Sequence, residues 1–527
     1  MSRTSAPNLL MVYPRFGLNS FWNYKATCEL VGTRYSAAPL GLITVAAMLP
    51  RDWNIRLVDC NIVTLDEADL RWADLVLTGG MLPQQRDTLR IVARAHSNGK
   101  PVLVGGPDVT SSPDEYAVAE FRLIGEAEGI IDKFIESWRS GDSGGTFRAG
   151  EFPDITRSPI PRFDLLNLRH YMHVGVQRTR GCPFVCEFCN VIELNGRKPR
   201  SKSTAQVLRE LDALYHLGYR GHVDFVDDNL IGNPVAVKPF LAELAAWLKR
   251  RRHPFEFTTE VSINLAQDDE LLRLMRDANF FAVFVGIETP DKEALRLTNK
   301  KQNLRIDIRE SVRRINEAGI YVNAGFIIGF DSERDSVAPA MIECIEETAI
   351  PVCMVGLLYA LPQTQLSRRL LDEGRLQCDS ARVASDDLTD QCTSGLNFAT
   401  LRPRREILKD YRLVLDRIYG PEKNFGRAMR MSCRLDMRGH RVRVPFTRTL
   451  RDLRTVGRIL WRSGVLDREA RGPFWSALLG CALRNPRAIR AGVAFSAHHL
   501  HYRPLSRFLD ARLGAQIRSL VDSTPWP

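Results

Sequence analysis

RTRGCPFVCEFCN, at residues 178–190, is the stretch that decides the expected fold of this chain. It places Cys182, Cys186 and Cys189 in a C-x₃-C-x₂-C spacing, and no fourth cysteine follows nearby. Thiolates favour zinc, copper(I) or iron–sulfur clusters. A structural zinc site uses four protein ligands, whereas a four-iron cluster held by three cysteines leaves one iron open to a ligand that is not protein. We therefore expect these cysteines to be the metal ligands of a cluster with one open position.

Two other interpretations of the cysteines stay open at this point. A zinc knuckle that lacks one ligand would show the same spacing, and Cys186 with Cys189 alone has the spacing of a redox pair. The other eight cysteines are scattered singly, and no secretory signal precedes them. We therefore expect a reducing, cytoplasmic environment.

The length and the charge distribution bound the organisation of the chain. A chain of 527 residues is too long for one core and predicts about three domains. Residues 401–527 hold 27 Lys and Arg against 10 Asp and Glu, a balance of +17 that leaves −6 for residues 1–400. Such an asymmetry is compatible with nucleic acid, an anionic membrane surface or a solvated arginine-rich face. No run of about 18 apolar residues occurs, so a soluble or peripheral protein is expected.

Residues 1–138 alternate strand-like apolar runs with helical patterns, which predicts a Rossmann-like, doubly wound parallel sheet. Three of the predicted strands end in glycine, which lets the backbone approach a large flat ligand without an intervening side chain. Residues 139–165 are rich in Ser, Gly, Asp and Pro and are predicted to form a linker. The candidate ligand-binding residues at the strand ends are Gly79, Gly80, Met81, Gly105, Gly106, Gly125 and Glu126.

A second series of strands and helices begins at Val174, directly before the cysteines. Its six predicted strands indicate a partial (β/α)6 barrel of the TIM type over residues 166–370, followed by a helical, basic C-terminal extension over residues 371–527. The fold class is therefore α/β. Chemistry in such barrels lies at the carboxyl ends of the strands, although any single carboxylate there can also be a structural ion pair or strand cap. The residues at these ends are Asp227, Asp228, Glu260, Glu288, Gly325 and Gly329.

The cysteine spacing, with the aromatic Phe188 before the last cysteine, resembles the signature of the radical S-adenosylmethionine (SAM) superfamily. In that family the amino and carboxylate groups of SAM chelate the open iron of a 4Fe-4S cluster, and an electron from the cluster cleaves SAM to a 5′-deoxyadenosyl radical. The resemblance also implies a role for each polar strand end. It places Asp227 and Asp228 near the methionine end of SAM, Glu260 and Glu288 near the ribose or reacting centre, and Gly325 to Gly329 under the adenine.

The N-terminal region resembles the cobalamin-binding domain that precedes the radical core in one branch of this superfamily. The matching pieces are APLGL at 38–42, LTGGM at 77–81, VGGP at 104–107 and IGEAE at 124–128. The chain lacks the D-x-H-x-x-G motif that supplies a histidine to cobalt, as members of this branch generally do. A Rossmann-like domain without a cofactor is the alternative. With its C-terminal region, the chain most resembles the cobalamin-dependent group that includes the hopanoid methylases.

The resemblance implies a methyltransferase that acts on an unactivated carbon of a small molecule or lipid. Its cofactors would be the 4Fe-4S cluster, SAM and cobalamin, and an electron donor such as ferredoxin or flavodoxin would serve it. No nucleic-acid partner is expected. Arginines interleaved with Trp461, Phe474 and Trp475 suggest peripheral contact with an anionic membrane.

Two alternatives to this function stay open. One is a radical SAM cyclase or ring-modifying enzyme that uses the N-terminal domain without methyl transfer. The other is a basic, zinc-containing nucleic-acid-binding protein, which would bind with a steep salt dependence. The C-terminal region shows no recognisable motif for reading nucleic acid.

Overall fold

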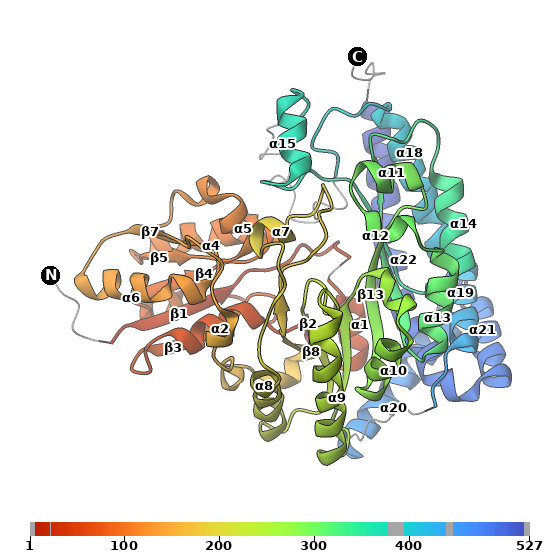
Figure 1. Cartoon of the computed structure of the whole chain (residues 1–527), viewed down its shortest axis with the longest axis horizontal. Coiled ribbons are helices and arrows are strands. Elements are labelled where there is room, and N and C mark those ends of the chain that lie inside the picture. Colours follow the sequence, from red (N-terminus) through yellow and green to blue (C-terminus); the bar gives the residue numbers. More distant parts are fainter. Residues whose placement is uncertain (1–5, 22, 378–394, 439–445, 521–527) are drawn as a thin grey trace.

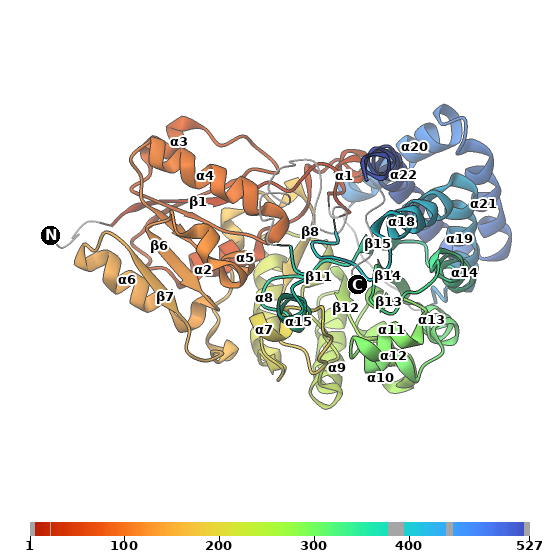
Figure 2. The same cartoon turned by 90° about the horizontal axis from the view of Figure 1, so that it is seen from above.

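Two parallel sheets and a set of C-terminal helices make up the fold in the computed structural model (Figure 1). The structure describes residues 6–21, 23–377, 395–438 and 446–520. The N-terminal sheet lies at one end of the molecule, the second sheet lies in the middle, and the helical extension covers the other end (Figure 2). The predicted α/β class with a helical C-terminal region is confirmed. Over the described part of the chain, no helix combines the length and the apolar composition that crossing a bilayer requires.

The N-terminal sheet is parallel throughout, with strand order β3-β1-β4-β5-β6-β7. This is the order of flavodoxin-like doubly wound sheets, in which the strand order reverses beside β1 and ligands bind at the carboxyl ends of the strands. The strands are β1 (Asn8–Tyr13), β3 (Asn54–Asp59), β4 (Leu75–Thr78), β5 (Val102–Val104), β6 (Phe121–Ile124) and β7 (Gly145–Arg148). The helices between them are α2 (Leu40–Met48), α3 (Glu67–Trp72), α4 (Gln85–Ser97), α5 (Pro107–Ser111) and α6 (Ile131–Ser140).

Both faces of the N-terminal sheet are apolar because helices cover both of them. In β1, Leu9 and Met11 face the core beneath α2 and α6, whereas Leu10 and Val12 face the core beneath α3 and α4. All four side chains are fully buried. The near-continuous apolar run of β1 therefore follows from its position inside a doubly wound sheet.

The predicted linker over residues 139–165 contains the sixth strand of this sheet. β7 pairs in parallel with β6 over four residue pairs, from Phe121 with Gly145 to Ile124 with Arg148. Its sequence, GTFR, is short and polar because it forms the edge of the sheet. Four residues with a single large apolar side chain, Phe147, leave no apolar run by which to detect this strand.

The second sheet has seven parallel strands in the order β15-β14-β13-β12-β11-β8-β2 and curls into a partial barrel (Figure 1). Six are the predicted barrel strands, and the seventh comes from the N-terminal region. They are β2 (Tyr35–Ala37), β8 (Tyr171–Val176), β11 (Gly221–Phe225), β12 (Phe255–Glu260), β13 (Phe280–Glu288), β14 (Tyr321–Ile328) and β15 (Cys353–Leu357).

Helices pack on the outside of the barrel, and the first of them begins with a capping box. The Ser203 hydroxyl accepts from the Gln206 N–H at 3.3 Å, and the Gln206 side chain accepts from the Ser203 N–H at 2.9 Å. The outer helices are α8 (Thr204–His216), α9 (Pro234–Arg250), α10 (Asp269–Asp277), α13 (Ile308–Glu317) and α14 (Ala338–Thr348).

The C-terminal extension is anchored to the barrel by buried polar contacts. The Arg427 side chain is completely buried, and it donates to the Ile350 carbonyl at 3.0 Å and to the Ile418 carbonyl at 2.7 Å while pairing with Glu346 at 2.6 Å. The Tyr419 hydroxyl donates to the Cys353 carbonyl at the start of β15. The helices are α18 (Arg404–Tyr419), α19 (Pro421–Arg434), α20 (Phe446–Trp461), α21 (Arg471–Arg484) and α22 (Ile489–Ser519).

A cluster of four charged residues, the interdomain ion cluster, joins the N-terminal sheet to the barrel. Arg180 in β9 (Thr179–Arg180) pairs with Glu126 at 2.6 Å and with Glu128 at 2.9 Å. Arg200 in β10 (Arg200–Ser201) also pairs with Glu126. The two glutamates follow β6, and their side chains are 7% and 4% exposed. The carboxyl edge of the N-terminal sheet is therefore fixed against the segment that carries the cysteines.

Arg180→Ala is expected to lower the free energy of unfolding by about 3–5 kcal/mol, because it leaves the buried Glu128 carboxylate without its arginine. Arg296→Ala is the control, since Arg296 and Glu293 are more than half exposed, and such pairs contribute about 0.2–1 kcal/mol. Urea unfolding monitored by tryptophan fluorescence measures both. An equal, small loss in the two variants would contradict a structural role for the interdomain ion cluster.

Candidate functional site

The three cysteines lie on one loop that follows β8 and β9, at the carboxyl end of the barrel. The Cys182 N–H donates to the Gly196 carbonyl at 3.2 Å, and the Cys189 N–H donates to the Cys186 carbonyl at 3.1 Å. Cys186 is buried, whereas Cys182 and Cys189 are partly accessible. The loop therefore presents three thiols at the end of the barrel where chemistry is expected.

The turn of the cysteine loop is held between two other parts of the barrel. The Glu187 N–H donates to the Thr298 carbonyl at 2.9 Å, and the Glu187 carbonyl accepts from the Leu366 N–H at 3.0 Å. The Glu187 side chain pairs with Arg369 in α15 (Gln365–Asp372) at 2.5 Å. These contacts fix the loop before any ligand binds, as a preorganised site requires.

A lysine and a glutamine that the sequence analysis did not single out lie beside the thiols. The Gln302 side-chain amide lies 3.6 Å from the Cys186 sulfur. Burial would lower the pKa of Lys300, but Glu288, Cys186 and Cys189 together raise it above its ordinary value. In the other direction, burial raises the pKa of the Cys189 thiol to about 12, against the lowering effects of the Val191 N–H and of Lys300. The positive charge of Lys300 thus favours thiolates at this loop.

The donor set fits an iron–sulfur cluster. Among the residues with defined positions, no three His, Cys, Asp or Glu side chains are arranged to share a single metal ion. A four-iron cluster takes each thiolate on a different iron, so its cysteines need not converge on one point. Three thiols on one fixed loop, beside a buried lysine, match that requirement.

Asp227 and Asp228 follow β11 and hold the start of the cysteine loop. Asp227 is 1% exposed, and it accepts from the N–H groups of Arg178 and Thr179 and from the Thr179 hydroxyl. Asp228 accepts from the Gly181 N–H at 3.1 Å and from the Asn195 side chain at 3.0 Å. Both aspartates therefore position the loop, and their predicted contact with the methionine end of SAM stays a prediction.

Glu260 ends β12, points into the barrel and remains accessible to solvent there. Burial, followed by the charges of Asp228, Asp224 and Glu288, raises the pKa of Glu260 from its ordinary 4.5 to about 8. Solvent that reaches the carboxylate screens part of this repulsion. An accessible carboxyl group with a raised pKa, close to other carboxylates, is a typical feature of a functional site.

Glu288 ends β13 in a strained conformation. Its φ is +66°, in a region that side chains other than glycine rarely adopt, and the strand register shifts between Gly286 and Glu288. The strain turns its carboxylate to Lys300, which it binds at 2.6 Å with both side chains at most 12% exposed. Local strain of this kind persists where the surrounding structure enforces it, often at functional sites.

The remaining predicted residues of the barrel lie on the cysteine loop or toward the carboxyl end of the barrel. Phe188 packs against Phe330 with ring centroids 5.9 Å apart, and the Lys300 ammonium lies 6.0 Å from the Phe188 ring centre. A Cβ added to Gly325 would meet the Phe284 ring at 3.2 Å. The Gly329 N–H donates to the buried Glu333 carboxylate at 3.0 Å, so that N–H is already engaged. Glycine at 325 therefore keeps the barrel wall thin where an adenine is expected.

At the carboxyl edge of the N-terminal sheet, several predicted ligand-binding residues also serve the packing of the domain. A Cβ on Gly79 would stand 1.8 Å from the Gly105 carbonyl oxygen, and one on Gly125 would meet Ala149 at 2.9 Å. Glu126 belongs to the interdomain ion cluster. The Met81 side chain is 45% exposed at this edge.

This edge of the N-terminal sheet faces the cysteine end of the barrel. The Gln363 side chain, just before α15, donates to the Ser111 carbonyl in α5 at 2.7 Å, and α5 also contacts α7 (Val191–Leu194), which follows the cysteine loop. The structure therefore brings the glycine-rich edge, with Gly80, Gly105 and Gly106, to the same side of the molecule as the cysteine loop.

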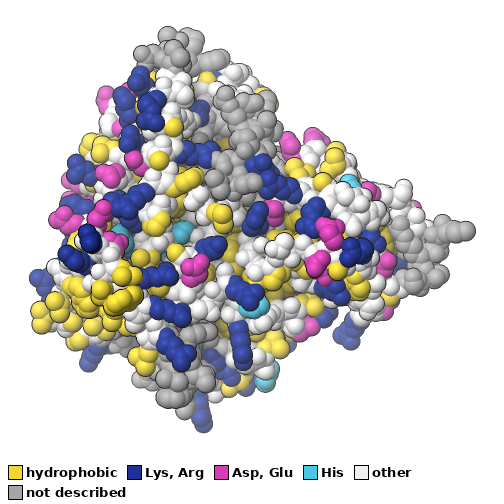
Figure 3. Space-filling model, turned by 180° about the vertical axis from the view of Figure 1, so that it is seen from behind, with side chains coloured by type: hydrophobic (Ala, Val, Ile, Leu, Met, Phe, Trp, Pro, Cys, Tyr) yellow, Lys and Arg dark blue, Asp and Glu magenta, His cyan; other side chains and the backbone are white. Residues whose placement is uncertain are grey.

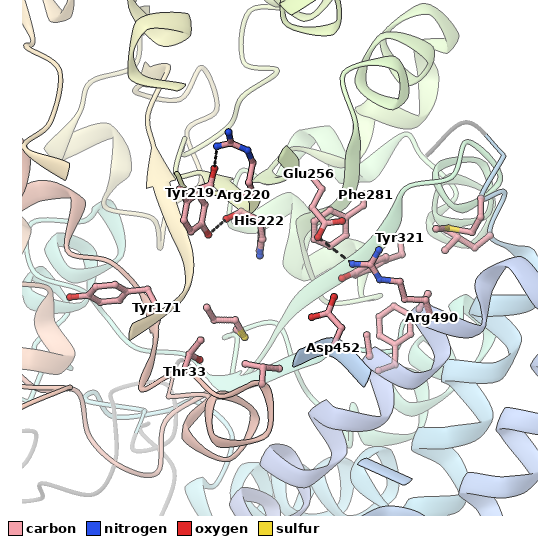
Figure 4. Close-up of a pocket in the computed structure, with 17 residues that line it drawn as sticks. Thr33, Tyr171, Tyr219, Arg220, His222, Glu256, Phe281, Tyr321, Asp452 and Arg490 are labelled. Atoms are coloured by element: carbon pink, nitrogen blue, oxygen red, sulfur yellow. Dashed lines mark hydrogen bonds and ion pairs between the residues drawn. The ribbon is translucent and has the colours of Figure 1, made fainter. Parts of the chain in front are cut away.

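A cavity of about 300 Å³ lies at the opposite, amino end of the barrel (Figure 4). Its wall includes Phe281 and Tyr321 at the starts of two barrel strands and Phe495 in α22. Glu256 and Arg490 form an ion pair of 3.8 Å across it. This cavity is separate from the cysteine loop, and none of the predicted site residues lines it.

The functional contacts that the sequence analysis missed are between residues far apart in the chain. Lys300 lies in Asn299-Lys300-Lys301, which resembles an ordinary solvent-exposed turn. The pairing of Arg180 with glutamates 52 and 54 positions earlier leaves no local pattern. The polar strand end at Glu288 was the one signal that pointed toward Lys300.

Comparisons with known proteins agree with this geometry. A model of the radical SAM superfamily matches residues 176–345, and a model described as a domain of unknown function, DUF4070, matches residues 364–513. An uncharacterized methyltransferase of Synechocystis sp. is 41% identical over 97% of this chain and 94% of its own length. The hopanoid C-2 methylase of Rhodopseudomonas palustris is 33% identical over 95% of this chain and 94% of its own length.

The solved structure of one enzyme resembles nearly the whole chain. The cobalamin-dependent SAM radical enzyme OxsB, with aqua-cobalamin bound, aligns over 98% of this chain and 82% of its own, with a TM-score of 0.60 and 16% identity. At that identity the likeness shows the fold, namely an N-terminal sheet, a partial barrel and an extension in one arrangement.

The raised pKa of Glu260 predicts a pH dependence of stability. The folded state holds the Glu260 proton more tightly than the unfolded state, so this stabilisation is complete below about pH 4.5 and is lost as the pH rises to about 8. Glu260→Gln should therefore raise the melting temperature of the cofactor-free protein more at pH 8.5 than at pH 6. Glu293→Gln is the control, since Arg296 lowers the pKa of Glu293. An equal effect of Glu260→Gln at both pH values would contradict the assignment.

Proposed function

This chain belongs to the radical SAM superfamily, in the group that contains the hopanoid C-2 methylase, and we propose that it is a cobalamin-dependent C-methyltransferase. The observation that carries the proposal is the placement of three thiols on one loop at the carboxyl end of the barrel, beside the glycine-rich edge of the N-terminal sheet. The superfamily match covers the cysteine loop and four of the five barrel strands that follow it in sequence, β11 to β14. It disfavours the zinc-containing nucleic-acid-binding alternative.

Each proposed cofactor is assigned to a set of residues that would hold it. Cys182, Cys186 and Cys189 would hold a 4Fe-4S cluster. SAM would lie over the barrel end, within reach of Glu260, Glu288 and the wall at Gly325. Cobalamin would lie on the N-terminal edge at Gly79–Met81, Gly105–Gly106 and Gly125, where no histidine is offered as a cobalt ligand. When bound, the cluster supplies an electron for the cleavage of SAM, and cobalamin carries the methyl group that is transferred.

The protein's own residues prepare the space between these sites. Asp227 and Asp228 fix the start of the cysteine loop through its backbone N–H groups. Lys300 supplies a buried positive charge beside the thiols, and Glu288 holds that lysine in place. Glu260 can keep a proton near neutral pH and can therefore donate a hydrogen bond to a ligand oxygen. The interdomain ion cluster keeps the two edges facing each other during the reaction.

The substrate class and partners belong to the same proposal. A small molecule or lipid substrate is supported by the similarity to the hopanoid C-2 methylase. An electron donor such as ferredoxin or flavodoxin would deliver electrons to the cluster. We place the reaction in the cytoplasm, peripheral to a membrane, and assign no nucleic-acid partner.

Protein reconstituted anaerobically with iron and sulfide should release 5′-deoxyadenosine from SAM when a reductant is added. Cys182→Ala should reduce that release at least about 100-fold, because the cluster loses one of its three ligands. Cys433→Ala, a partly exposed cysteine in α19, is the matched control and should keep wild-type release. Chromatographic quantification of 5′-deoxyadenosine measures both variants. Unchanged release from Cys182→Ala would contradict the cluster assignment.

Methyl transfer is tested separately with SAM labelled in its methyl group and with cobalamin. Incubation with a cell extract from a strain that lacks this protein should move label into an extract component, and partition into organic solvent tells a lipid product from a water-soluble one. Release of 5′-deoxyadenosine with no label in any product would favour the cyclase or ring-modifying alternative over the methyltransferase.

A further inference from the structure

An exposed apolar surface covers the outer side of the C-terminal extension. Large hydrophobic side chains gather there on α20, α21, the short π-helix η8 (Arg462–Leu466) between them and the start of α22. Figure 3 shows such a gathering at the lower left, with Lys and Arg beside it. We call this surface the extension patch; it consists of Leu453, Trp461, Val465, Leu466, Trp475, Leu479, Leu483 and Ile489. Single exposed hydrophobic residues need no explanation, but a contiguous group marks an interaction surface.

Helix α21 is apolar on two opposite sides. Phe474 and Cys481 are buried against the rest of the extension, so the expectation that Phe474 contacts a membrane is wrong. Trp475, Leu479 and Leu483 lie four residues apart on the other side and are 39%, 60% and 86% exposed. Between Arg471 and Arg484 the helix has no charged residue. A surface helix normally has a polar outer face. The outer face of α21 is apolar instead, and it is therefore suited to contact with an apolar partner.

Helix α20 adds a basic stripe beside the apolar one. Leu453 and Trp461 lie eight residues apart and share a face, and both are more than half exposed. The adjacent stripe consists of Arg454, Arg458 and Arg462, spaced four residues apart. Arg458 donates to the Leu30 carbonyl at 3.1 Å, so the stripe is fixed to the body of the protein.

The positive charge around the extension patch is not neutralised locally. Residues 446–490 contain ten arginines and three acidic residues. Of those acids, Glu469 pairs with Arg507 and Arg503 in α22, and Asp467 accepts from the N–H groups of Glu469 and Ala470. Within the described ranges, six of the arginines form no ion pair: Arg454, Arg462, Arg468, Arg471, Arg484 and Arg487.

We propose that the extension patch docks this protein onto the surface of an anionic lipid bilayer. Leucine and tryptophan side chains enter the boundary between head groups and acyl chains, and arginines beside them bind lipid phosphates. Helix α21, at 14 residues and about 21 Å, lies in the plane of the membrane. The proposal deepens the proposed function because it names where a lipid substrate would be met.

Two further features agree with a bilayer as the occupant. The Trp475 ring packs on Gly464 and its N–H donates to the Gly464 carbonyl at 2.9 Å, so the side chain is held rigidly and loses little entropy on docking. The cavity at the amino end of the barrel has Asp452 of α20 and Arg490 of α22 in its wall (Figure 4). These residues adjoin Leu453 and Ile489 of the patch in sequence.

The test is co-sedimentation of the full chain with vesicles. Wild-type protein should bind vesicles of phosphatidylglycerol and phosphatidylcholine at low salt, and the bound fraction should fall at least about tenfold in pure phosphatidylcholine or at about 1 M salt, where charges are screened. Trp461→Ser/Leu479→Ser/Leu483→Ser and, separately, Arg454→Gln/Arg462→Gln should each weaken binding about tenfold or more. Val118→Ser/Val235→Ser is the control, since these exposed side chains lie elsewhere, and it should bind as wild type.

Release of 5′-deoxyadenosine is measured on the same variants, away from vesicles. Unchanged release of 5′-deoxyadenosine together with lost vesicle binding supports docking. Loss of 5′-deoxyadenosine release in all variants alike would point to failed folding, which circular dichroism and a melting curve identify. Equal vesicle binding by wild type and both patch variants would overturn the proposal whatever the catalytic result. A stable dimer that the patch substitutions dissociate, with no vesicle binding, would assign the patch to self-association and would also overturn it.

Discussion

The interdomain ion cluster is the constraint on which the arrangement of this protein depends. Arg180 and Arg200 meet Glu126 and Glu128 with every side chain at most 18% exposed. Burial of charges is costly, and it is tolerated where each charge has a partner in good geometry. Here the partners come from different sheets, so pairing requires the carboxyl edge of the N-terminal sheet to face that of the barrel. Arg180 is also two residues before Cys182, so the same contact places the cysteine loop.

Around that fixed loop, the barrel gathers charges that are individually unfavourable. Glu288 adopts a left-handed backbone conformation to reach Lys300. Burial, together with the nearby carboxylates, raises the pKa of Glu260 so that it can hold a proton near neutral pH. Asp227 accepts from the loop through both of its oxygens, and Asp228 accepts from the Gly181 N–H and the Asn195 side chain. The carboxylates at the strand ends therefore divide into two kinds: those that build the loop, and those that remain directed at the space above it.

Much of this could be predicted from the sequence because the signals were local. The strands of both sheets follow from their apolar runs, and the Ser203 capping box follows from spacing alone. β7 was missed because an edge strand of four mostly polar residues has no inward alternation, and β2 was missed because its three residues join a sheet whose other strands begin more than 130 residues later. Lys300, Arg180 and Arg200 act through partners that sequence spacing does not connect. Glu126 was expected to bind a cofactor, and in the structure it pairs with Arg180 and Arg200 in the interdomain ion cluster.

The most direct test of the account is the metal and cobalamin content of the protein purified without oxygen. The account predicts about four iron and four sulfide per chain, with bound cobalamin in near-equal amount to protein and no stoichiometric zinc. Iron should be lost in the variant that lacks Cys182, Cys186 and Cys189. Zinc in place of iron, or iron that remains after the three cysteines are removed, would contradict it.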